Sequence, residues 1–157
     1  QIGSSPLSDL ALSDDKKTAA IGGEAGTVYL LDVASGKIKK AYKNVNLDNI
    51  YKIDYRSGVV ITAGQDRKAT VITDNGMLKA RIEGEFLVYA AALSPSASKA
   101  AVATKEDNDI EVFGINPNTK IALAKGLSST PNRIVFLNES EFAACGDENK
   151  ILIWGIK

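Results

Sequence analysis

Short apolar runs, separated by turns rich in glycine, asparagine and acidic residues, extend along the whole chain. In the clearest example, small apolar residues at 18–22 are followed by a turn at 23–26 and a second apolar run at 27–32. Runs of this length bounded by such turns are typical of β-strands. No segment keeps a 3.6-residue apolar period together with capping residues, so we expect helix to be nearly absent.

The strand–turn–strand unit occurs four times without gaps. Equivalent turn positions are Gly23, Gly64, Lys105 and Gly146, so consecutive copies are 41 residues apart. The register also holds in the strand that follows each turn, where Leu30, Val71, Val112 and Ile153 are equivalent. Small residues form another column before the turn, at Gly22, Ala63, Thr104 and Cys145. Repeats of about 40 residues, each made of short strands, are typical of propeller blades.

Two of these units resemble the WD-repeat β-propeller family. Residues 23–32 read Gly-Glu-Ala-Gly-Thr-Val-Tyr-Leu-Leu-Asp, and residues 146–154 read Gly-Asp-Glu-Asn-Lys-Ile-Leu-Ile-Trp. The resemblance covers essentially the whole chain and implies four antiparallel strands per repeat. The family's Trp-Asp pair is replaced in every copy, and there is no histidine. The His–Asp–Ser/Thr–Trp hydrogen-bond network of typical members therefore cannot form, and the chain resembles a degenerate, WD-like propeller.

We therefore expect an all-β protein, a single partial β-propeller domain at 1–157 with four consecutive blades. The approximate blade limits are 7–43, 48–83, 88–126 and 132–157. The repeat places a fourth strand of the last blade at about 161–165, so that blade should lack its outer strand. The resemblance implies the C-terminal half of a larger propeller, completed by the missing half or by a second copy of the chain.

Composition excludes several classes of function. The 157 residues include 19 basic and 19 acidic side chains, no histidine and one cysteine. Zero net charge without a basic block argues against a nucleic-acid binder, and no apolar run has the length of a membrane span. The missing histidine excludes His-based catalysis, and one cysteine excludes an internal disulfide or thiolate metal cluster. We expect no catalytic residue, metal or cofactor.

Candidate binding residues occur in the turns between second and third strands, which share one face of a propeller together with the linkers between blades. Loops held by a rigid scaffold often carry recognition, although acidic residues are also common in solvated turns. Phe86, Leu87 and Tyr89, in the linker before the third blade, are either interface anchors or inter-blade packing. The residues predicted to bind a partner on this loop face are Glu24, Arg67, Lys68, Glu106, Asp107, Asp147 and Glu148.

Three other patterns have simpler explanations. The acids between 106 and 111 lack the spacing and glycine of a calcium loop, so a turn is expected. Lysines on the fourth strands, such as Lys39 and Lys120, fit the protection of a sheet edge against pairing. Cys145 falls in the column of small residues and is expected to be a buried small side chain.

The sequence favours a non-enzymatic scaffold or docking module that binds another protein. Two alternatives remain open. One is an accessory factor of a bacterial periplasmic respiratory system of the nitrate reductase type; the other is a propeller hydrolase or lyase acting on a small molecule or carbohydrate. A cytoplasmic and a periplasmic location are both compatible with one thiol, because any export signal would lie upstream of Gln1.

Overall fold

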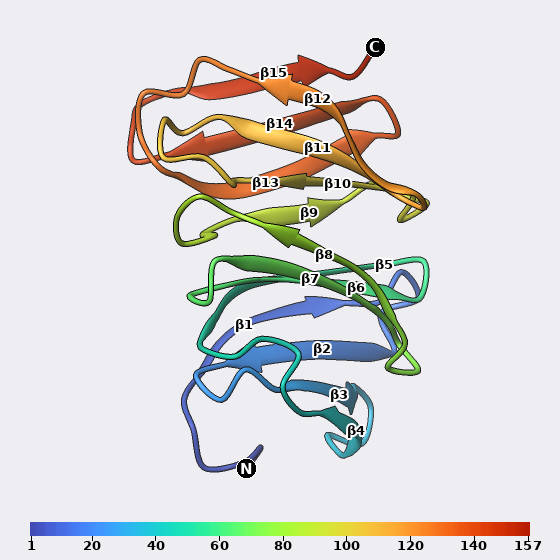
Figure 1. Cartoon of the computed structure of the whole chain (residues 1–157). Helices are drawn as coiled ribbons and strands as arrows, with labels where there is room; N and C mark the ends of the chain where they lie inside the picture. The colour runs from blue at the N-terminus through green and yellow to red at the C-terminus, as the bar shows by residue number, and fades with distance from the viewer.

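The computed structural model describes residues 1–157 and consists of fifteen β-strands without a helix. It contains no helical segment that could cross a membrane. The strands form four separate antiparallel sheets, which follow one another in chain order from the N-terminus to the C-terminus (Figure 1). Each sheet is a simple meander, in which every strand pairs with the next one along the chain.

Three sheets have four strands and the last has three. The first contains β1 (Leu7–Leu12), β2 (Thr18–Gly23), β3 (Val28–Asp32) and β4 (Ile38–Tyr42). The second contains β5 (Ile50–Arg56), β6 (Val59–Gly64), β7 (Lys68–Thr73) and β8 (Leu78–Glu83). The third contains β9 (Ala91–Leu93), β10 (Lys99–Val102), β11 (Ile110–Ile115) and β12 (Asn118–Ala124). The fourth contains β13 (Pro131–Asn138), β14 (Glu141–Gly146) and β15 (Ile151–Gly155). The expected all-β fold with a three-stranded last blade is confirmed, and each sheet is called a blade below.

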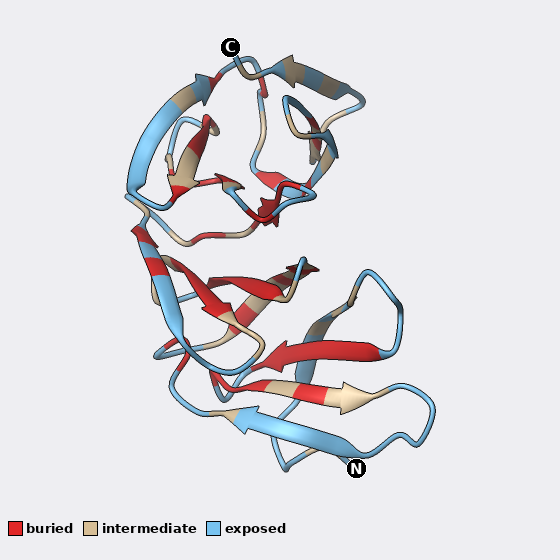
Figure 2. Cartoon of the chain, turned by 90° about the vertical axis from the view of Figure 1, so that its right-hand side faces the viewer, coloured by how far each residue is buried: buried red, intermediate tan, exposed pale blue.

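Apolar cores fill the three spaces between consecutive blades. Between the first and second blades, Val28 and Leu30 contact Val60 and Ile72 in one buried cluster. A second cluster joins blades two and three, and a third joins blades three and four. Figure 2 shows the buried residues on strands in the middle of the molecule and exposed residues on outer strands and turns. Each blade is therefore stabilised by its neighbours rather than by a core of its own.

The column of small residues has a steric cause. β2 and β6 are buried along their whole length. At Gly22 in β2, a Cβ atom would lie 2.8 Å from Cγ2 of Ile50 in the next blade. A larger residue would therefore force the first two blades apart, which explains why small residues recur there in the sequence. Cys145, at the equivalent position of the last blade, is only partly buried, in contrast to the expectation, because no further blade packs against β14.

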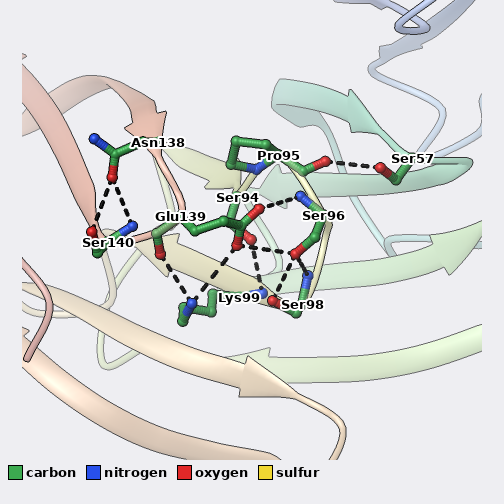
Figure 3. Close-up of polar contacts among 9 residues, drawn as sticks. All are labelled: Ser57, Ser94, Pro95, Ser96, Ser98, Lys99, Asn138, Glu139 and Ser140. Carbon is green, nitrogen blue, oxygen red and sulfur yellow. Dashed lines mark hydrogen bonds and ion pairs between the residues drawn. The ribbon is translucent and has the colours of Figure 1, made fainter.

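The turns at one end of the blades are tied to one another across the blade boundaries. The hydroxyl of Ser57 donates to the carbonyl oxygen of Pro95 (2.8 Å). Glu139 accepts hydrogen bonds from the backbone and hydroxyl of Ser96, and its carbonyl oxygen accepts one from Nζ of Lys99 (2.9 Å; Figure 3). These bonds link the second blade to the third and the third to the fourth.

The outward faces of the first and last blades are apolar and uncovered. In the first blade, Leu10 and Leu12 on β1 are 58% and 41% exposed, whereas Ile21 beside Leu10 in the sheet is buried. In the last blade, Ile151 and Ile153 on β15 are 72% and 61% exposed. Monomeric soluble proteins rarely leave contiguous apolar faces of this kind open.

Two strand limits differ from what the local sequence pattern indicates. The run at 89–94 has the composition of a strand, but β9 covers only Ala91–Leu93. Asn116, Pro117 and Asn118 have the composition of a three-residue turn, yet Ile115 pairs directly with Asn118. The connection is therefore a two-residue hairpin, and β12 starts earlier than its apolar pattern indicates.

Replacing Ile61, which is fully buried between blades two and three, with alanine should lower the free energy of unfolding by about 2–5 kcal/mol. The matched change Ile153→Ala, on the open face of the last blade, should cost no more than about 0.5 kcal/mol in dilute solution. Urea unfolding at constant m-value measures both. Equal losses would contradict an uncovered outer face on the last blade.

Candidate functional site

The turns between the second and third strands of each blade lie at the same end as the linkers between blades. This follows from the meander, in which the second strand of a blade ends where the fourth strand ends. Backbone hydrogen bonds join the two sets of loops: Val45 donates to the carbonyl of Gly26 (3.1 Å), and Gln65 donates to that of Asn49 (2.8 Å). We call this end, formed by turns 24–27, 65–67, 103–109 and 147–150 and linkers 43–49, 84–90 and 125–130, the loop face.

The seven residues predicted to bind a partner lie in these turns or next to them, but they differ in their bonding. Glu24, Arg67 and Glu106 are exposed and form no side-chain hydrogen bond or ion pair within the chain. Lys68 pairs with Glu83 (3.2 Å). Asp107 accepts a hydrogen bond from the backbone of Asp109 in its own turn. The structure thus leaves three of the seven free to contact another molecule.

The other two predicted residues, Asp147 and Glu148, bond to the start of β13 and to the last linker, respectively. Oδ1 of Asp147 accepts a hydrogen bond from the side chain of Asn132 (3.0 Å). Glu148 accepts two from Ser128, one from the hydroxyl (2.7 Å) and one from the backbone N–H (2.9 Å). These two bonds lower the pKa of Glu148 because they favour the ionised carboxylate. The two acids therefore stiffen the loop face.

A pocket of about 350 Å³ opens on the loop face between the third blade and the linker to the fourth. It is lined by Phe86, Leu87, Tyr89, Ala103, Lys105, Glu106, Asn108, Thr130 and Pro131. Of the seven predicted residues, it contains only Glu106. Sequence reasoning missed Asn108, Thr130 and Pro131, because nothing in their local pattern shows that two separate loops meet here.

The two aromatic residues of the pocket have different environments. Phe86 is 47% exposed, which leaves its ring available to a ligand. Tyr89 stacks on Tyr51 of the preceding blade, with ring centroids 5.1 Å apart and an angle of 19° between the planes. Tyr89 therefore packs between blades, whereas for the exposed Phe86 the role of an interface anchor stays a prediction.

The charges around the pocket are partly neutralised within the chain. Lys105 bonds to Glu85, and this hydrogen bond raises the pKa of the lysine. The neighbouring Glu106 has no such partner. The pocket therefore combines an exposed aromatic ring with one unpaired carboxylate, a composition suited to an amphipathic side chain.

A buried polar network occupies the second blade. Nδ2 of Asn46 donates to Oδ1 of Asp66 (2.9 Å), and Oδ1 of Asn46 accepts a hydrogen bond from Thr62 (2.5 Å). The other carboxylate oxygen of Asp66 accepts from the backbone of Leu47 (2.9 Å). The network fixes the linker onto the turn at 65–67 without a histidine. Asn46 was missed because a single asparagine in a linker looks like an ordinary turn residue.

In the third blade, the acids expected to form a simple turn divide into two groups. Glu106 and Asp107 are exposed, whereas Asp109 and Glu111 are buried. Asp109 pairs with Lys125 and Glu111 with Lys120, each at 3.0 Å. Lys120 lies on the outer strand, and Lys125 directly follows its end. Both lysines thus pair with buried acids of the blade, in addition to any role in protecting the sheet edge.

Comparison with known proteins agrees with this architecture. The chain is 24% identical over 156 residues to actin-interacting protein 1 of Caenorhabditis elegans. It superposes on U3-55K with a TM-score of 0.81 at 16% identity over 94% of the chain. It superposes on the β-propeller domain of Cps50 (Swd1) from Myceliophteria thermophila with a TM-score of 0.83 at 15% identity over 98%. All three are WD-repeat proteins or WD40 propellers. No family model matches the sequence.

The chain therefore has the β-propeller fold of these WD-repeat proteins. It spans 26% of the length of the curated relative, and 46% and 54% of the two solved chains. The WD40 propeller relatives typically act as protein-interaction scaffolds.

Replacing Lys120 with methionine removes the partner of buried Glu111 and should destabilise the protein by about 1 kcal/mol at neutral pH, because the pair is partly screened by solvent. Burial raises the pKa of Glu111, but bonds from Thr104 and Lys120 outweigh it and leave the pKa below 4.5. Because the folded-state pKa is lowered, the stabilisation is complete above pH 4.5 and is lost as the pH falls through the lowered value.

The stabilities of the two proteins should therefore converge in acid, which chemical unfolding between pH 7 and pH 3 can measure. Lys79→Met, an exposed lysine without an ion pair on the equivalent strand of blade two, is the matched control and should have little effect. A loss for Lys120→Met that is independent of pH would contradict the assigned charge pair.

Proposed function

We propose that this propeller is a non-enzymatic docking module that binds another protein through its loop face. The observation that carries the proposal is the pocket of about 350 Å³ with Phe86 exposed at its wall and Glu106 unpaired beside it. Exposed aromatic side chains in pockets are frequent anchors of protein interfaces. The candidate charges Glu24 and Arg67 lie on the same face and add directional contacts.

The rigidity of the loops supports binding by a preformed surface. Glu148 holds the last linker through Ser128, Asp147 holds the start of β13 through Asn132, and the Asn46 network holds the linker before the second blade. A surface that is ordered before binding loses less conformational entropy when a partner docks. In this proposal Glu24, Arg67 and Glu106 contact the partner, whereas Lys68, Asp107, Asp147 and Glu148 keep the face in shape.

The name of the curated relative makes actin the first candidate partner to test. The propeller would also need cover for the apolar outer faces of its first and last blades, including Leu10 and Ile153. We propose that further blades cover them, either from the missing half of a longer chain or from a second copy of this one. The shares of 46% and 54% of the two solved chains support a unit of about half a ring.

Photocrosslinking can test the loop face before the partner has been identified. A benzophenone amino acid placed at Phe86 or Arg67 should crosslink a second polypeptide in cells that express the protein naturally. The same probe at Asn75, in a turn at the opposite end, is the control and should give much less product. Crosslinks mainly from Asn75 would contradict the choice of face, and their absence from all three positions would contradict the docking proposal.

The isolated chain should self-associate through its uncovered blades, because apolar faces of this size favour burial. Light scattering at increasing concentration should then give a mass above the 16.7 kDa of one chain. The double change Leu10→Lys and Ile153→Lys, one on each outer face, should restore the monomer. A wild-type chain that stays monomeric at all concentrations would contradict pairing between two copies. The missing half of a longer chain would then be the remaining candidate to cover the outer blade faces.

A further inference from the structure

A second hollow lies on the rim of the propeller, away from the loop-face pocket. It is a groove of about 420 Å³ between the outer strand of the first blade and the β7–β8 hairpin of the second. We call it the rim groove. It is lined by Ala41, Tyr42, Lys43, Asn44, Val45, Thr70, Ile72, Gly76, Leu78 and Arg81.

The lining combines an apolar wall with two cations and no acid. Val45 and Ile72 are buried, and Leu78 beside them is half exposed. Lys43 and Arg81 are exposed, and neither forms an ion pair within the chain. Unpaired surface cations are common by themselves, but two of them flanking an apolar groove that has no carboxylate are a more specific arrangement.

The acids nearest in sequence on the hairpin already have partners elsewhere. Asp74 accepts a hydrogen bond from the hydroxyl of Tyr55 through its side chain (3.1 Å) and one from Tyr42 through its carbonyl oxygen (2.8 Å). Glu83 pairs with Lys68. Neither Asp74 nor Glu83 lines the groove, so the positive charge of Lys43 and Arg81 is not neutralised there.

The groove also contains a buried hydroxyl without a partner. Thr70 is 1% exposed, and its Oγ1 forms no hydrogen bond within the protein. The hydroxyl of Thr62, opposite it in the sheet, is used by Asn46. Leaving a buried polar group unsatisfied typically costs about 1–3 kcal/mol, so native structures rarely contain one without a reason. Arg81 lies opposite Thr70 in the β7–β8 register, which puts the free hydroxyl beside a free cation.

The repeat itself shows what this arrangement lacks. The residue 41 positions after Thr70 is Glu111, whose buried carboxylate accepts a hydrogen bond from Thr104 (2.5 Å) and pairs with Lys120 (3.0 Å). The third blade therefore holds its carboxylate between Thr104 and Lys120. In the second blade Thr70 itself stands at the position of that carboxylate, and the equivalents of Thr104 and Lys120 are Ala63 and Lys79. A buried hydroxyl without a partner thus replaces a buried carboxylate that has two.

We propose that the rim groove binds an acidic, aliphatic peptide segment of a partner protein. A carboxylate of the peptide would lie between Lys43 and Arg81 and accept a hydrogen bond from Thr70, and a neighbouring aliphatic side chain would cover Val45, Ile72 and Leu78. A simple anion would leave the apolar wall open to water, which favours a peptide with both kinds of side chain. The rim groove shares Lys43, Asn44 and Val45 with the loop face but has no residue in common with the loop-face pocket around Phe86.

The test uses the full chain and a fluorescein-labelled octapeptide in which aspartate alternates with leucine, followed by fluorescence anisotropy. The matched peptide has asparagine in place of each aspartate and should bind about tenfold more weakly or less. The double change Lys43→Glu and Arg81→Glu should weaken binding of the acidic peptide by a similar factor or more. Lys79→Glu, on the same strand but outside the groove, is the control for total charge and should change the affinity little.

Thr70→Val separates binding from folding. Valine has nearly the same shape and removes a hydroxyl that bonds to nothing in the chain, so the stability should not fall. Affinity for the acidic peptide should fall about two- to tenfold, as expected for one hydrogen bond. If the Thr70→Val protein binds the acidic peptide with normal affinity, the hydroxyl of Thr70 takes no part in binding, and that part of the proposal is wrong.

The other outcomes are also decisive. No saturable binding of the aspartate peptide up to millimolar concentration would overturn the proposal, and so would equal binding of the asparagine peptide or of the Lys43→Glu, Arg81→Glu protein. If a peptide with phosphoserine in place of aspartate binds and the aspartate peptide does not, the groove is a phosphopeptide site instead. These peptide-binding results do not depend on the loop-face crosslinks, so either proposal can be contradicted while the other stands.

Discussion

The structure depends on one constraint: no blade of this chain can bury both of its faces by itself. Each blade is a single antiparallel sheet, and its apolar side chains are covered only where the next blade packs against it. The close approach at Gly22, where a Cβ would meet Ile50, shows how little space separates adjacent blades. The same constraint leaves apolar side chains such as Leu10 and Ile153 exposed on the outer faces of the first and last blades, because no further blade packs there.

Polar contacts add precision to this apolar packing. In the second blade, Asn46 links the linker to the blade through Thr62 and Asp66, without a histidine. In the third blade, buried Glu111 is satisfied by Thr104 and Lys120. The blades thus share a backbone arrangement while each uses different polar side chains. The sequence motif has diverged, and the polar contacts that hold each blade have changed with it, but the fold is the same.

Much of the fold could be predicted from the sequence, because the repeat aligns residues that perform the same steric task. The small residues at Gly22 and Ala63 fall in the tightly packed second strands, and the periodic turns fall between strands. The limits of short elements were harder to predict. β9 is only three residues long, and the hairpin at 116–117 depends on direct pairing of Ile115 with Asn118, which local composition does not reveal.

The candidate site was only partly predictable for a related reason. A sequence shows that Glu106 lies in a turn, but not that Thr130, in another linker, lies at the same pocket. Nor does it distinguish a free acid such as Glu24 from Glu148, whose carboxylate is occupied by Ser128. Charge counts along the chain treat both acids alike. Only the three-dimensional arrangement separates residues that shape a surface from residues that can bind through it.

The repeat provides an internal standard for interpreting such differences. Equivalent positions share their backbone surroundings, so differences between blades reflect their side chains. Glu111 bonds to Thr104 and Lys120, whereas Thr70 replaces it in the second blade, where the equivalent neighbours are Ala63 and Lys79. Since an unsatisfied buried group carries a cost in stability, the unpartnered hydroxyl of Thr70, opposite Arg81 in the sheet, argues for a role outside the folding of the chain.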